Sequence, residues 1–118
     1  MPSLAAYRLE AFEALDSFWF IRAVEELDRT DVTLSLRLHI RDGLFIQVFA
    51  GEITGAISLA LIEGDARILG LDYHRGRWHL HPFDQPTAHL PFDEPLIPTP
   101  LRYFLRLVRD LLLTQELL

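Results

Sequence analysis

Four of the five histidines in this chain fall within a stretch of sixteen residues, at His74, His79, His81 and His89. Imidazole is the side chain best suited to binding a metal or transferring a proton near neutral pH. No other part of the sequence is as dense in such groups, so we expect any chemistry of the protein to lie here. The residues in or next to this stretch that could contact a substrate are Tyr73, His74, Arg75, Arg77 and Trp78.

One interpretation of the cluster is a metal site. His79 and His81 are two residues apart on a predicted strand, so their rings should project from the same face, with Leu80 on the other. His89 would complete a three-histidine set, and Asp84 a set of two histidines and one carboxylate. The sequence therefore allows a divalent metal, with zinc or nickel as suitable ions, and makes the protein a candidate metal-dependent hydrolase.

A second interpretation uses the same residues without a metal. In metal-independent ribonucleases, one imidazole deprotonates the ribose 2′-hydroxyl and a protonated partner serves the leaving oxygen. Here the catalytic residues would be His79, His81, His89 and Asp84. The nearby arginines would contact the phosphate, and an aromatic ring of the same stretch could stack on a base.

A third interpretation is structural. Histidine and tryptophan side chains can hydrogen-bond to a loop while their rings pack against it. Residues 82–100 hold six of the seven prolines and are predicted to form an ordered, irregular loop. The histidines would then fix this loop to the sheet, in a domain that binds a partner and is not an enzyme.

The composition predicts a single domain over residues 1–118. Half of the residues are hydrophobic, which supports a packed core, and the absence of cysteine excludes disulfides and thiolate metal sites. The net charge of −6 disfavours nonspecific nucleic-acid binding, although all eleven basic residues are arginine, which pairs well with phosphate. The acidic N-terminal segment does not resemble a signal peptide, and no apolar run approaches the ~20 residues of a membrane helix. We therefore expect a cytoplasmic protein.

Alternating hydrophobic and polar residues predict five or six short antiparallel strands. The clearest strand covers residues 32–40, after a less regular one over 18–28, and an Asp42-Gly43 turn of type I′ follows it. Residues 44–50 are apolar on both faces, as in a central strand covered by helix on one side. Residues 53–63 fit either a strand or a short buried helix.

Two helices should flank these strands. Ser3 can cap a helix that ends near Leu15, and Thr99 followed by Pro100 begins a closing helix. The apolar stripe of that helix comprises Leu101, Phe104, Leu105, Val108, Leu111 and Leu112. The predicted fold is α+β, with one curled antiparallel meander flanked by the terminal helices.

The C-terminal leucines outside this stripe predict an interface. Leu113, Leu117 and Leu118 are not needed to cover the sheet and would form a large apolar patch for a monomer of this size. We therefore expect a homodimer, or a protein partner bound at the closing helix.

The segment from 62 to 89 resembles a group of small prokaryotic proteins of uncharacterised function. They share a pattern of the form RI-G-D, followed by WH-HP and a later histidine. Here the pattern falls on Arg67, Ile68, Gly70, Asp72, Trp78, His79, His81, Pro82 and His89. More distantly, residues 32–92 are similar to the TumE-type toxins of bacterial toxin–antitoxin pairs. This resemblance implies a toxin–antitoxin component acting on RNA.

Overall fold

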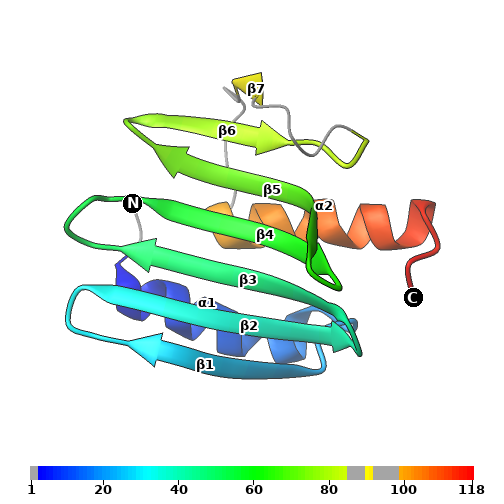
Figure 1. Ribbon diagram of the computed structural model, residues 1–118. Helices are drawn as coiled ribbons and strands as arrows, with labels where there is room; N and C mark the ends of the chain where they lie inside the picture. The colour runs from blue at the N-terminus through cyan, green and yellow to red at the C-terminus, as the bar shows by residue number, and fades with distance from the viewer. Residues whose placement is uncertain (1–2, 85–89, 92–98) are drawn as a thin grey trace.

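The chain folds as one antiparallel sheet with two helices on the same face (Figure 1). The computed structural model describes residues 3–84, 90–91 and 99–118. The elements in chain order are α1 (Leu4–Ser17), β1 (Ala23–Arg29), β2 (Thr33–Arg41), β3 (Leu44–Gly51), β4 (Ile57–Glu63), β5 (Ala66–His74), β6 (Arg77–His81), β7 (Leu90–Pro91) and α2 (Pro100–Thr114). The strands are hydrogen-bonded in sequence order, each antiparallel to the next, which confirms the predicted α+β meander.

Both helices begin where the sequence places a capping residue. The Ser3 side-chain oxygen accepts a hydrogen bond from the Ala6 amide at 3.1 Å, and that of Thr99 accepts one from the Arg102 amide at 3.3 Å. Helix α1 packs on β1, β2 and β3, whereas α2 packs on β4. An ion pair of 2.9 Å between Arg102 and Glu13 joins the two helices, so they cover this face together.

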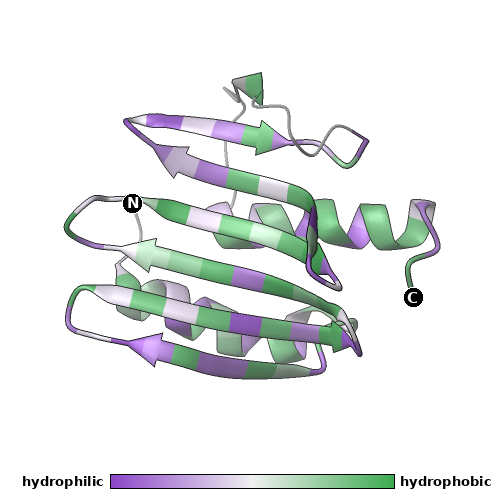
Figure 2. Ribbon diagram, in the orientation of Figure 1, coloured by the Kyte–Doolittle hydropathy of each residue, from purple (hydrophilic) through white to green (hydrophobic). Residues whose placement is uncertain are grey.

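The core lies between the helices and the sheet. The leucines of β2 at positions 34, 36 and 38 are at most 1% exposed, and Leu44, Ile46 and Val48 of β3 lie beside them. Figure 2 shows the resulting alternation of hydrophilic and hydrophobic residues along β2. The predicted stripe of α2 is buried except for the half-buried Leu111, and its buried members are Leu101, Phe104, Leu105, Val108 and Leu112.

Strand β4 shows that residues 57–63 of the ambiguous segment 53–63 form a strand and not a helix. It pairs along its whole length with β3 on one side and β5 on the other. Burial of Ile57, Leu59 and Leu61 on one face follows the two-residue period of a strand. A continuous apolar run does not reveal this period, because small or apolar residues also occupy the other face.

The strand predicted over residues 18–28 begins only at Ala23. The Phe18 amide still donates to the Ala14 carbonyl, and the Ile21 amide donates to Phe18, so residues 18–21 form a turn after the helix. Phe20 is 1% exposed within this turn. The apparent alternation in this segment therefore arises from a connection that packs into the core.

The turn between β2 and β3 is not of type I′. Gly43 has a φ of +77°, but Asp42 is not among the described residues with positive φ, and type I′ requires it at both positions. An irregularity in the pairing between His39 and Arg41 accommodates this turn instead. The turn between β5 and β6 does have two positive φ values, +53° at Arg75 and +75° at Gly76.

The sheet is open and has two edge strands, β1 and β7. Strand β1 has six exposed residues of seven, and its pairing with β2 shifts between Glu26 and Asp28. At the other edge, the two-residue strand β7 pairs with β6. This adds a seventh strand within the segment predicted to be irregular, most of which lies outside the described residues.

Candidate functional site

His79 and His81 project from the face of the sheet that the helices leave uncovered. In the register of β5 and β6, His79 lies opposite Asp72 and His81 opposite Gly70. The intervening Leu80 packs against the core. The rings therefore share one face, as their spacing predicts.

His81 is buried, at 1% exposure, and both of its ring nitrogens have partners. Its Nδ1 lies 3.2 Å from Arg67 Nη2, and its Nε2 lies 2.9 Å from Asp72 Oδ2. A guanidinium can only donate, so Nδ1 accepts and the Nε2–H donates to the carboxylate. The ring is thus held as a neutral tautomer without a lone pair for a metal. This geometry favours a structural role for His81.

Gly70 provides the space for this ring. A Cβ at Gly70 would lie 3.2 Å from His81 Cδ2 and 3.1 Å from Arg67 Cδ, so these neighbours would have to shift by a few tenths of an ångström. The four residues of this partly buried network, Arg67, Gly70, Asp72 and His81, all belong to the RI-G-D and WH-HP pattern. The spacing of the pattern therefore follows from the pairing of β5 with β6.

His79 belongs to a different group of side chains. A cleft of about 340 Å³ at the hairpin between β5 and β6 is lined by Asp72, His74, Arg75 and His79. His74 lies opposite Arg77 in the register, two residues along the strands from the pair Asp72 and His79 and on the same face. The cleft therefore combines two imidazoles, a carboxylate and a guanidinium. His74, predicted only to contact a substrate, is the histidine that accompanies His79 here.

The structure does not assemble the predicted metal set with Asp84. Among residues 3–84, 90–91 and 99–118, no group of three or more histidine, aspartate and glutamate side chains could hold a metal ion. Asp84 lies exposed in the turn after β6, and the nitrogens of His81 are already occupied. His89 lies outside the described residues.

The two aromatic residues predicted to contact a substrate lie on the opposite face. Tyr73 and Trp78 are paired across β5 and β6, with ring centroids 5.1 Å apart, and both pack against the core beneath the helices. They cannot stack a base bound beside His79. Side chains alternate between the two faces of a strand, so Tyr73 and Trp78 lie on the same face as Leu80 and opposite the histidines.

A second basic cleft on the uncovered face did not emerge from the sequence. It has a volume of about 640 Å³ and is lined by Arg22, Arg37, His39, Ile40, Arg41, Asp42, Gly43 and Phe45. The Arg37 guanidinium lies 4.5 Å above the Phe45 ring, and His39 Nε2 is 2.8 Å from Glu25 Oε1. The only sign of this cleft in the sequence is that Arg37 and His39 occupy alternate positions of β2.

Phe49 lies between the two clefts on the same face. It is 38% exposed and is flanked in the register by Ser35 on β2 and Ser58 on β4. The row continues through Asp72 to His79. The uncovered face therefore carries a partly exposed aromatic ring between two groups of basic side chains.

Comparison with known proteins adds no relative. No family model matches the chain, and no curated protein or solved structure matches it significantly. In the part of the chain that the structure describes, no helix is long and apolar enough to cross a membrane.

Proposed function

We propose that this protein binds single-stranded RNA on the uncovered face of its sheet. The observation that carries the proposal is the position of Phe49 between the two basic clefts. Proteins that bind single strands combine exposed aromatic rings, on which bases stack, with cations that follow the phosphates. From β2 to β6 the face spans four strand spacings, about 19 Å, which accommodates several nucleotides.

The charges of this face support an anionic ligand despite the net charge of −6. The Glu25 carboxylate is hydrogen-bonded to His39, and the Asp72 carboxylate lies 3.8 Å from the guanidinium of Arg67. By contrast, Arg22, Arg37, Arg75 and Arg77 have no ion pair within the described residues. The local balance is therefore positive where a strand would lie.

We further propose, as the resemblance to TumE-type toxins implies, that a cytoplasmic RNA is the target. Cleavage would then fall to His79 and His74, which line one cleft together with Asp72 and Arg75, whereas His81 is buried outside it. One imidazole would take the 2′-hydroxyl proton and the other would protonate the leaving oxygen, with Arg75 beside the phosphate. His81 would hold the Asp72 carboxylate in place and would not exchange protons with RNA.

The binding proposal is tested by fluorescence anisotropy with a labelled twelve-nucleotide oligouridine. Four arginine–phosphate contacts give a slope of log K against log salt of about −2.8, since each contact contributes about −0.7. Replacing Arg75 and Arg77 together by Ala should reduce the slope to about −1.4. Phe49→Ala should weaken binding at least fivefold, because stacking on one base is worth at least about 1 kcal/mol.

Arg106→Ala is the matched control, because Arg106 is exposed on α2, on the other side of the molecule. An equal loss of affinity in this variant, or no saturable binding by the unmodified protein, would contradict the proposal. Gel analysis of the same RNA distinguishes the two parts of the proposal, binding and cleavage. Intact RNA after long incubation with tight binding would refute cleavage and leave the alternative, a non-enzymatic binding domain with structural histidines.

A second proposal concerns assembly through the C-terminal end. Leu117 packs on the chain's own core, and its carbonyl accepts a hydrogen bond from Arg41 Nε at 2.8 Å. Leu113 and Leu118 remain 60% and 54% exposed. We propose that these two leucines contact a second copy of the chain across a two-fold axis.

Light scattering tests this contact. The unmodified protein should have twice the mass of one chain at micromolar concentration, and Leu113→Glu should halve it. Leu9→Glu is the control, since Leu9 is 59% exposed on α1. A strict monomer before substitution, or a dimer that only Leu9→Glu disrupts, would rule out the C-terminal interface.

A further inference from the structure

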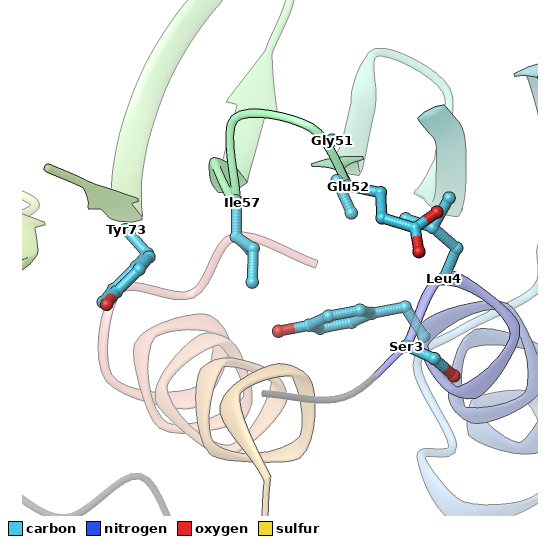
Figure 3. Close-up of a pocket in the computed structure, with 9 residues that line it drawn as sticks. Ser3, Leu4, Gly51, Glu52, Ile57 and Tyr73 are labelled. Atoms are coloured by element: carbon cyan, nitrogen blue, oxygen red, sulfur yellow. The ribbon is translucent and has the colours of Figure 1, made fainter. Parts of the chain in front are cut away.

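A pocket of about 300 Å³ lies on the helix-covered side of the sheet, on the opposite face from the histidine cleft. Figure 3 shows Ile57 and Tyr73 entering it from neighbouring strands, opposite the start of α1 at Ser3 and Leu4. The remaining lining residues are Tyr7, Ala50, Gly51, Glu52 and Gly55. The pocket is thus formed by the first turn of α1 and by the ends of β3, β4 and β5.

The polar group that distinguishes this pocket is the hydroxyl of Tyr7. Tyr7 is 1% exposed, and its Oη has no hydrogen-bond partner among the described residues. Burial, and secondarily the Glu10 carboxylate, raises the pKa of this hydroxyl, so it stays protonated and can donate. Leaving a buried donor unpaired costs folding free energy, which a bound acceptor would recover.

The other walls define what kind of molecule fits. Leu4, Ala50 and Ile57 supply an apolar lining, whereas the Glu52 carboxylate stands exposed on the turn after β3. A carboxylate at this position repels anions and leaves neutral ligands unaffected. The volume is about twice that of a cavity that holds benzene, so one aromatic ring with a short substituent fits.

We propose that this pocket binds a small, uncharged and largely apolar molecule whose single acceptor oxygen takes a hydrogen bond from the Tyr7 hydroxyl. The hydroxyl is shielded from water, so the acceptor reaches it when a side chain of the pocket wall moves aside. This site is independent of the proposed RNA surface, because Tyr7 and Tyr73 belong to the covered face.

Acetophenone and ethylbenzene test the proposal, since they have nearly the same shape and differ in one carbonyl oxygen. In amide-detected NMR titrations of the full chain, acetophenone should bind about three- to tenfold more tightly, the range expected for one neutral hydrogen bond. The shifted amides should include those of Ala50, Gly51, Ile57 and Tyr73. Benzoate, the anionic analogue, should bind more weakly than acetophenone.

Tyr7→Phe should remove the preference by weakening acetophenone and leaving ethylbenzene unchanged. Tyr103→Phe is the control, because Tyr103 lies on α2 outside the pocket, and it should retain the preference. Equal affinities in the unmodified protein would mean that no ligand reaches the hydroxyl and would overturn the proposal. A preference that survives Tyr7→Phe, or shifts confined to other residues, would overturn it as well. The comparison of ligands on the unmodified chain decides the question even if Tyr7→Phe does not fold.

Discussion

The contact between the His81 ring and Gly70 makes a quantitative prediction about stability. His81→Ala removes two hydrogen bonds that involve charged partners and leaves a cavity under Arg67. Such bonds contribute about 1.5–3 kcal/mol each when buried, but Asp72 and Arg67 are 24% and 36% exposed, so water will recover part of this. We expect a net loss of about 2–4 kcal/mol. His74→Ala, at an exposed position of the neighbouring strand β5, should cost less than about 1 kcal/mol.

Gly70→Ala provides the second arm of a double-mutant cycle. Its new methyl group would lie 3.2 Å from the His81 ring, and relieving that overlap should cost about 1–2 kcal/mol. In the His81→Ala background the same methyl group enters the vacated space and should be neutral or stabilising. The predicted interaction is therefore about −1.5 kcal/mol, well above the ~0.3–0.5 kcal/mol scatter of independent sites.

Urea unfolding measures all four free energies, provided the slope m is the same in each variant. The remaining contact of the methyl group, with Arg67 Cδ at 3.1 Å, involves a flexible side chain and should yield at little cost. Additive effects of the two substitutions would refute the reasoning, because the ring would then not lie over Gly70. A loss in His74→Ala equal to that in His81→Ala would also refute it.

Two further predictions concern Tyr7 and the helix cap. The folded-state pKa of Tyr7 is raised by burial, so its contribution to stability is complete below the ordinary tyrosine pKa of about 10 and is lost as pH rises through the folded value. Urea unfolding should therefore show that the stability of the unmodified protein falls between pH 9 and 11. Tyr7→Phe should remove this fall, and Tyr103→Phe should retain it. The same fall in all three proteins would contradict the assignment to Tyr7. Thr99→Ala should cost about 1 kcal/mol in thermal unfolding through loss of the α2 cap, and Thr99→Ser should be nearly neutral. Equal losses in these two variants would exclude the cap.

The fold was largely predictable because its signals are local. The alternation of residues 33–40 and the caps at Ser3 and Thr99 act within a few residues of themselves. The segment from Phe18 to Phe20 was misassigned because a two-residue period also arises when a turn packs alternate rings into a core. The β2–β3 turn was misassigned in type because pairing beside Arg41, not the Asp-Gly dipeptide alone, determines its backbone.

The candidate site was predictable in position but not in its roles. The density of histidines located the β5–β6 hairpin, yet the partners of His81 come from another strand and depend on register. For the same reason His74, which the sequence separates from His79, lines the same cleft. The pattern shared with the resembling proteins included Arg67, Gly70 and Asp72, but a pattern does not say whether its residues react or pack. Only burial and hydrogen bonding separate these possibilities.

The irregular, charged strand β1 has a consequence for solubility. An edge strand with unpaired backbone groups can act as a template for a strand of another molecule and so start aggregation. Here the shift between Glu26 and Asp28 interrupts the hydrogen-bonding pattern, and the exposed Glu25 adds a charge that an incoming strand would have to desolvate. Edge-to-edge growth of the sheet into fibrils is thereby opposed at β1.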